Sequence, residues 1–166
     1  MDTPNPFQAP AAELRSETSL ELAGRGERLG AALIDALAVL VVTLPVAWLT
    51  GSFDGVMEGK QPGLGLQVLN FVLGVATFLA INGYLLKTYG QTLGKRLLKL
   101  AIVDLEGRQP DWIPMIAKRY GVLWVASAIP FAGGLVGLVD ALFIFRADRR
   151  CVHDLIAETR VVKLRD

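Results

Sequence analysis

Sulfur and imidazole side chains are scarce in this sequence. Cys151 is the single cysteine and His153 is the single histidine. One cysteine excludes an intrachain disulfide and a cysteine-based metal cluster, and one histidine excludes a histidine-rich metal site or a relay of several histidines. We therefore expect no metal and no cofactor.

Catalytic signatures and a strong net charge are also missing. The sequence contains neither HExxH nor GxSxG, the signatures of zinc proteases and of many serine hydrolases. The run GQTLGK at 90–95 is one residue too short for a phosphate-binding loop, and Arg96 stands where the magnesium-binding Ser or Thr belongs. The net charge is only +1. We expect neither an enzyme nor a nucleic-acid partner.

The N-terminal segment lacks the features of a cleavable signal peptide. Residues 1–28 carry five acidic groups and three prolines, without a basic start or an apolar centre. This composition predicts that residues 1–22 form a flexible cytoplasmic tail. Residues 23–166 are then expected to form one transmembrane domain.

Long apolar runs are what the sequence has in abundance, since 52% of its residues are hydrophobic. Residues 29–49 contain one charge, Asp35, and residues 64–86 contain none. At 1.5 Å per residue, each run is long enough to cross a hydrocarbon core of about 30 Å as a helix. Both runs are predicted to be transmembrane helices.

A third apolar run, residues 120–145, contains Asp140 and is interrupted by PFAGG at 130–134. Proline and paired glycines weaken a helix, so the run is either one tilted span or a hairpin of two short helices. Seven of the 17 basic residues lie in 87–119 and six follow residue 145, while residues 50–63 contain only Lys60. Basic residues favour the cytoplasmic side, which favours the hairpin. The predicted fold is an all-α bundle of four transmembrane helices with both termini in the cytoplasm.

The connection between the second and third runs combines two patterns. Four apolar residues recur at helical spacing, while three basic residues project elsewhere: Leu93, Leu97, Leu100 and Ala101, against Lys95, Arg96 and Lys99. Such a helix binds anionic lipid headgroups or packs on its neighbours. Residues 101–105 and 158–164 are β-prone and are candidates to pair beneath the membrane.

Three motifs in order resemble the RDD family of bacterial membrane proteins, which is named for one arginine and two aspartates. They are RLGAALID at 28–35, GQTLGKRLLKLAIVDLEGRQP at 90–110 and DALFIFRADRRCVHDLIAETRVV at 140–162. The resemblance assigns Arg28 and Asp35 to the first two positions and Asp154 to the second aspartate, with Asp140 as a rival. It also marks the residues Gly90, Thr92, Gly94, Lys95, Arg119, His153 and Thr159. Glu158 departs from the glycine expected before the threonine.

Asp35 is the residue that most needs an explanation, because a charge within a membrane helix costs several kcal/mol unless it faces the bundle. Arg28 lies two helical turns away on the same face, about 10 Å along the axis. We expect a polar cluster of Arg28, Asp35, Asn82 and Asp140. This cluster locks the bundle through a basic residue such as Arg119 or Arg146, binds a proton, cation or solute, or recognises a partner.

Two function classes follow from these patterns. The protein is a small ion or solute transporter of the bacterial inner membrane, coupled to protons or cations through a buried carboxylate and assembled as a homo-oligomer. Alternatively, it is a non-catalytic adaptor or assembly factor that docks a cytoplasmic protein. A transporter depends on Asp35, whereas an adaptor depends on Lys95, Arg96, Lys99 or the C-terminal tail.

Overall fold

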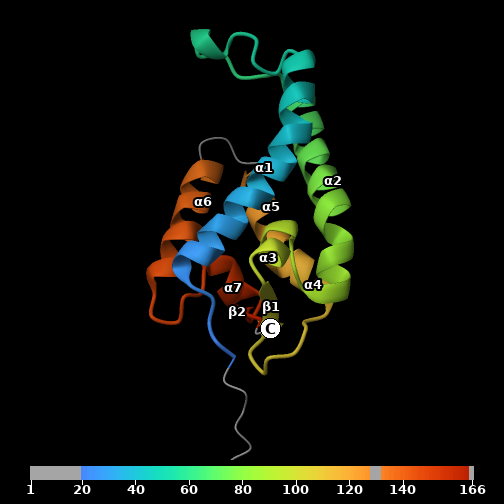
Figure 1. The fold of residues 1–166 in the computed structure, drawn as a ribbon. Helices are drawn as coiled ribbons and strands as arrows, with labels where there is room; N and C mark the ends of the chain where they lie inside the picture. The colour runs from blue at the N-terminus through green and yellow to red at the C-terminus, as the bar shows by residue number, and fades with distance from the viewer. Residues whose placement is uncertain (1–19, 128–131, 165–166) are drawn as a thin grey trace, which may run out of the picture.

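The structure is a computed structural model that describes residues 20–127 and 132–164 (Figure 1). Helices dominate, and two short strands lie at one end of the molecule. In chain order the elements are α1 (Arg25–Leu49), η1 (Val56–Glu58), α2 (Leu64–Tyr89), α3 (Leu93–Leu97), β1 (Leu100–Asp104), α4 (Trp112–Met115), η2 (Ile116–Gly121), α5 (Val122–Ser127), α6 (Ala132–Leu142), η3 (Phe143–Phe145), α7 (Val152–Ile156) and β2 (Thr159–Lys163).

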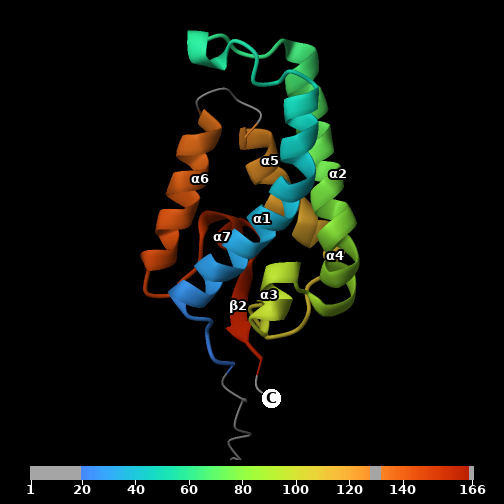
Figure 2. The ribbon, with the colours of Figure 1, turned by 45° about the horizontal axis from the view of Figure 1, so that its top comes forward.

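The two predicted long helices form as α1 and α2, with 25 and 26 residues. They pack side by side, and their outer halves, with the connection that carries η1, extend beyond the helices and strands from α3 to β2 (Figures 1 and 2). Both are long and apolar enough to cross a membrane. Large apolar side chains such as Leu40, Val41 and Trp48 are exposed along them, which is the pattern expected where lipid replaces water.

The third apolar run forms two helical arms that pack against each other. The first arm is continuous through α4, η2 and α5, and the second is α6. Residues 128–131, where we expected part of the break, lie outside the described residues, while 133 and 134 already belong to α6. Since α6 has 11 residues, it rises about 16 Å, roughly half the thickness of a hydrocarbon core. Among the described residues, only α1 and α2 have the length of candidate membrane spans.

The two β-prone runs pair as an antiparallel ladder, from Leu100 opposite Lys163 to Asp104 opposite Thr159. The incoming chain adds to this ladder, because Leu22 forms a bridge with Val162. Leu20 packs on the same strands. Residues 20–22, which the sequence analysis assigned to the tail, are therefore attached to the folded domain.

Helix α3 is shorter than the sequence pattern predicts. It ends at Leu97, and Lys99 adopts a left-handed backbone conformation with φ 55°. Leu100, expected on the helix, is buried in β1 instead, and Ala101, which fitted both the helical spacing and the β-prone run, also lies in β1. The helical pattern was wrong beyond Leu97 because pairing with β2 and burial in the core outweigh a marginal helical spacing.

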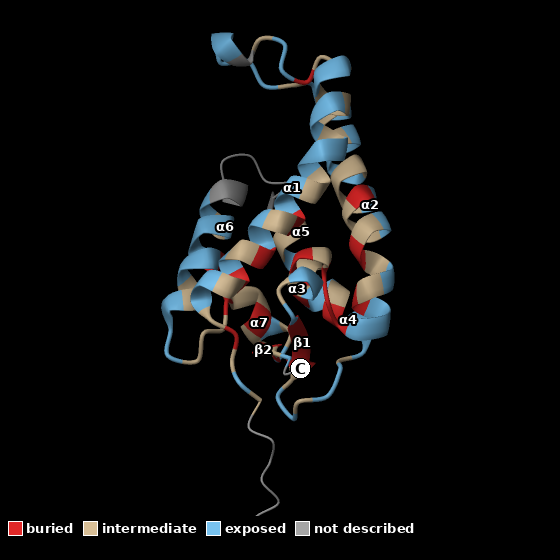
Figure 3. Cartoon of the chain, viewed as in Figure 1, coloured by how far each residue is buried: buried red, intermediate tan, exposed pale blue. Residues whose placement is uncertain are grey.

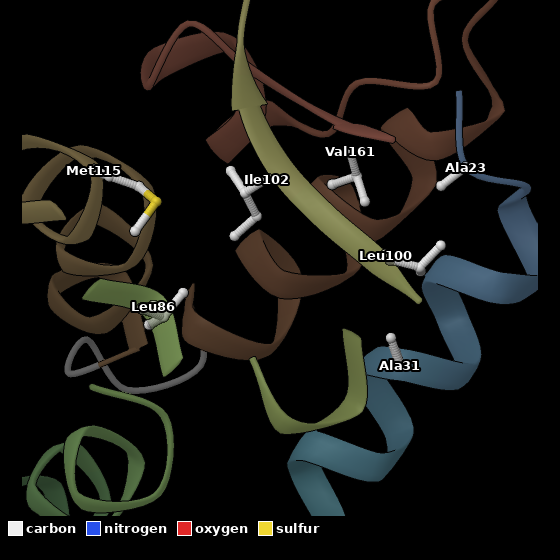
Figure 4. Packing of buried hydrophobic residues seen from close by; sticks show 7 residues of the cluster. All are labelled: Ala23, Ala31, Leu86, Leu100, Ile102, Met115 and Val161. Atoms are coloured by element: carbon white, nitrogen blue, oxygen red, sulfur yellow. The ribbon is translucent and has the colours of Figure 1, made fainter. Parts of the chain in front are cut away.

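The end of the molecule that holds the β1–β2 ladder contains both the apolar core and most of the buried charged groups. We call it the polar end, after those charged groups. Buried residues concentrate there, whereas the outer halves of α1 and α2 are mostly exposed (Figure 3). Figure 4 shows the buried cluster around β1: Ala23, Ala31, Leu86, Leu100, Ile102, Met115 and Val161. This core fixes α1, α2 and η2 relative to the ladder, and so positions the charged groups described next.

Candidate polar site at one end of the bundle

The first turn of α3 is capped by three side chains from three different segments. The N–H of Leu93 donates to Asn82 Oδ1 at 2.8 Å, and the N–H of Gly94 donates to Asp35 Oδ1 at 2.7 Å. The N–H of Lys95 donates to the hydroxyl of Thr92 at 3.4 Å. The first N–H groups of a helix have no partner within the helix. Asp35 and Asn82, both buried, supply those partners from α1 and α2.

Glycine permits α3 to lie directly on α1. A Cβ atom added at Gly94 would stand 2.1 Å from the carbonyl oxygen of Ala31, well inside van der Waals contact. Gly90 ends α2 in the left-handed region with φ 63°, a conformation that glycine adopts without strain. These two signature glycines therefore serve the turn and the helix contact that place α3 over Asp35.

Asp154 is fully buried and binds two arginines that come from different elements. Arg28 on α1 donates to its Oδ2, and Arg119 on η2 donates to its Oδ1. The N–H of Cys151 also donates to Oδ2 at 3.0 Å, and Arg119 donates further to the Thr159 hydroxyl at 2.7 Å. One carboxylate thus joins α1 and η2 to α7, and Arg119 extends the network to β2.

These neighbours determine the ionisation of Asp154. Burial raises the pKa of Asp154, but Arg119, His153 and Arg28 outweigh burial and leave that pKa well below its usual range. The carboxylate is therefore charged at neutral pH. A charged group at this depth is stable only because its hydrogen bonds and its charge are both satisfied.

Asp140, near the C-terminal end of α6, holds His153. The N–H of His153 donates to Asp140 Oδ1 at 2.9 Å, and its ring Nδ1 lies 2.6 Å from Asp140 Oδ2. The other ring nitrogen, Nε2, lies 3.8 Å from Asp154 Oδ1. Burial and the charge of Arg119 lower the pKa of His153, and the two aspartates oppose that shift. The rival aspartates of the family motif are thus neighbours that flank one imidazole.

A cavity of about 420 Å³ opens between α1, α6 and α7. Four basic side chains line it, together with Asp140 and His153: Arg25, Arg28, Lys95 and Arg119. The rest of the wall is mainly apolar and includes Leu29, Ala32, Leu142, Ile144 and Phe145. Burial, followed by the charge of Arg119, lowers the pKa of Lys95 to about 8. The cavity therefore combines an apolar wall with an excess of positive charge.

The structure brings most of the residues chosen from sequence into this one region. Arg28, Lys95, Arg119, Asp140 and His153 line the cavity. Asp154 and Thr159 bind Arg119, while Asp35, Asn82, Thr92 and Gly94 form the adjoining cap of α3.

Neither basic residue considered as a lock for Asp35 binds it. Arg119 pairs with Asp154, and Arg146 pairs with the exposed Asp148. The basic residues of the connection also separate. Lys95 faces the cavity, whereas Arg96 stacks over Tyr89, with its guanidinium carbon 4.2 Å from the ring centroid.

Three arginines that the sequence analysis did not assign to the site also secure this region. Arg25 donates from Nε to the carbonyl of Ile144 at 3.2 Å, and so closes the end of the second arm. Arg149 donates to the carbonyls of Leu22 and Ala23, and Arg150 donates to that of Thr159. Arg25 lies one turn before Arg28 on the same face of α1, and this spacing was the available signal.

Two apolar helices of membrane-spanning length, attached to a compact end held by buried arginine–aspartate pairs, define a small helical membrane protein. The chain belongs to the RDD family, whose model matches residues 22–158. It is 34% identical over 141 residues to the uncharacterized protein YckC of Bacillus subtilis, covering 84% of this chain and 83% of that protein. It is 32% identical over 121 residues to an uncharacterized protein of Haemophilus influenzae, covering 70% of this chain and 74% of the relative. No solved structure matches the chain.

Proposed function

We propose that this RDD protein is a small membrane transporter that binds an organic anion in the cavity between α1 and α6. The observation that carries the proposal is the composition of the cavity wall. Four basic side chains face one aspartate across a space of about 420 Å³. Ligand pockets are typically about 300–1,000 Å³, mainly apolar, with a few convergent polar groups. An anion with an apolar body fits this combination.

The state of the acidic residues favours an anion over a cation as the solute. Asp35 is used by the α3 cap, Asp154 by two arginines and Asp140 by His153. A cation would have to displace one of these partners. An anion instead meets Lys95 and Arg25, which are not held by a carboxylate in any pair formed among the described residues. The proposed site is therefore cationic. It differs from the mechanism expected from the sequence, in which a buried carboxylate couples transport to protons or cations.

We propose that the polar end faces the cytoplasm and that the membrane is the inner membrane. The start of α1 and the end of β2 both lie at this end, as the bridge between Leu22 and Val162 requires. Thirteen of the 17 basic residues lie in 87–119 and 146–166, the segments that build or adjoin the polar end. The positive-inside tendency supports this orientation.

We propose further that copies of the chain associate through α6. Its residues Leu135, Leu138 and Leu142 are exposed, although the helix is too short to cross a membrane alone. A second copy would cover this face and enlarge the space available to a solute. The adaptor alternative requires neither association nor a solute.

Uptake by proteoliposomes that contain only the purified protein tests the function. The probe is radiolabelled benzenesulfonate, which is permanently anionic, and the matched neutral probe is benzenesulfonamide. We expect uptake of the anion above protein-free liposomes and no protein-dependent uptake of the amide. A double variant, Arg25→Gln with Lys95→Gln, should lower anion uptake at least fivefold. Lys60→Gln, which changes an exposed lysine outside the cavity, should leave uptake unchanged.

Two outcomes would overturn the proposal. If uptake of the anion equals that of protein-free liposomes, the protein does not transport this class of anion. Equal uptake by wild type and the double variant would show that the cavity is not the binding site. Binding of a cytoplasmic protein, lost on replacement of Arg96 or Lys99, would then favour the adaptor.

A further inference from the structure

One corner of the cavity brings together the only thiol, the only imidazole and a carboxylate. Asp140 on α6 and Cys151 and His153 around the start of α7 offer one ligand atom each, and these atoms all lie within 4.8 Å of one another. All three residues line the cavity. We propose that they form a binding site for Zn²⁺, with the remaining coordination position open to the cavity.

The ligand types select the ion. Zinc accepts sulfur, nitrogen and oxygen ligands, and three protein ligands with an open fourth position are common among its non-structural sites. Hard cations such as Mg²⁺ and Ca²⁺ prefer oxygen ligands throughout. Tetrahedral zinc with bonds of about 2.0–2.3 Å separates its ligand atoms by roughly 3.5 Å. Small rotations of the three side chains bring atoms that now lie within 4.8 Å to this spacing.

The surroundings supply what a zinc site needs beyond its ligands. His153 Nδ1 faces Asp140, while Nε2 lies 3.8 Å from Asp154 Oδ1. A metal-bound histidine commonly directs its other ring nitrogen at a carboxylate, which orients the ring. Arg28 lies 3.5 Å from the sulfur of Cys151 and can donate a hydrogen bond to a thiolate. Asp154 pairs with both Arg28 and Arg119, and the negative charges of the Asp140 and Cys151 ligands offset the charge of the ion itself.

Zn²⁺ forms bonds to the Cys151 sulfur, to His153 Nδ1 and to an oxygen of the ionised Asp140. The thiol proton leaves to solvent. The imidazole keeps one proton, which moves from Nδ1 to Nε2 and there faces Asp154. Binding therefore releases one proton and requires no oxidant, reductant or second reactant.

Cobalt substitution tests the site directly, because Cys151 is the only cysteine. The purified full-length protein in detergent is titrated with Co²⁺, then with Zn²⁺. We expect a sulfur-to-cobalt charge-transfer band and the visible bands of a tetrahedral ion, both removed by stoichiometric Zn²⁺. The absence of a charge-transfer band in folded wild-type protein would overturn the proposal, as would bands that Zn²⁺ fails to displace.

Substitutions distinguish the proposed zinc ligands from nearby residues that do not bind the ion. Cys151→Ser should abolish the charge-transfer band, and His153→Gln should weaken Zn²⁺ binding at least tenfold in a chelator competition assay. Asp148→Asn, which changes an exposed carboxylate three residues before Cys151, should change neither readout. Unaltered Zn²⁺ affinity in folded His153→Gln would also overturn the site. Because this test measures neither uptake nor anion binding, its result is independent of the proposed transport.

Discussion

Asp35 and Gly94 are 59 residues apart, yet the carboxylate of Asp35 accepts the N–H of Gly94 at 2.7 Å. This contact gives the acid inside α1 a structural task, since it satisfies a helix N-terminus that the fold buries. Asn82 performs the same task for Leu93 from α2. The two longest helices thus hold α3 between them.

Two substitutions of Asp35 distinguish the contribution of its hydrogen bond to stability from the contribution of its charge. Asp35→Leu leaves the N–H of Gly94 buried without a partner, and we expect a loss of about 1–3 kcal/mol in unfolding free energy. Asp35→Asn retains an acceptor oxygen and should lose less. Thermal unfolding of both variants in detergent measures the difference. A leucine variant as stable as wild type would exclude the capping role.

Gly94→Ala tests the contact of α3 with α1. The added methyl group would meet the backbone of Ala31 at 2.1 Å, and backbone cannot rotate away. We expect a loss of about 1–3 kcal/mol, typical of overpacking. The control is Gly83→Ala in α2, where an added Cβ meets nothing within 4 Å. Alanine is the better helix former, so this control should unfold at the same or a higher temperature.

Asp154→Asn tests the buried charge pairs. It leaves Arg28 and Arg119 buried with their opposite charge removed, and such a loss typically costs about 3–5 kcal/mol. Asp148→Asn, which breaks an exposed pair with Arg146, should change the melting temperature little, because water and salt screen such a pair. Similar melting temperatures for the two variants would contradict the structure.

The same carboxylate predicts a pH dependence with a defined sign. The pKa of Asp154 lies below its usual range in the folded protein, so its contribution to stability is fully present above the unfolded-state pKa of about 3.9. That contribution is lost as pH falls through the folded-state pKa. Wild type should therefore lose more stability than Asp154→Asn between pH 5 and pH 3, measured as the shift in unfolding midpoint.

Glu158 occupies a backbone conformation that suits glycine. Its φ is 55°, in the left-handed region, which costs other residues about 1–2 kcal/mol. Replacing Glu158 with glycine removes this cost, but the greater flexibility of glycine in the unfolded chain offsets part of the gain in stability. We expect Glu158→Gly to raise stability by up to about 1 kcal/mol. Ala157→Gly, at a neighbouring residue with φ −86°, should lower it.

Lys95 predicts how anion binding responds to pH. The pKa of Lys95 is lowered to about 8, so its ammonium group loses its charge as pH rises through this value. Binding of benzenesulfonate should weaken between pH 7 and pH 9, measured by displacement of the labelled probe from purified protein. Lys95→Arg keeps the charge across this range and should remove most of the dependence.

The sequence by itself determined where the apolar helices α1 and α2 form, because a run of more than 20 apolar residues needs no distant partner to be recognised. It also determined the family, through motifs that stand in a fixed order, and the strand character of residues 101–105 and 158–164. It failed at α3, where five residues of helix and a turn at Lys99 depend on burial of Leu100 and Ala101 in the ladder. Local propensity is weak over so short a segment.

Tertiary structure alone decided which charges meet. Arg28 and Asp154 are separated by 126 residues and Arg119 and Asp154 by 35, so no helical spacing indicates either pair. The sequence analysis considered Arg119 as a partner for Asp35. In the structure, packing of η2 against α7 brings Arg119 to Asp154 instead. A buried charge is stable only beside its counter-charge and with its hydrogen bonds made. The partner is therefore fixed by where the apolar core around β1 places each helix, and the residue types alone leave that choice open.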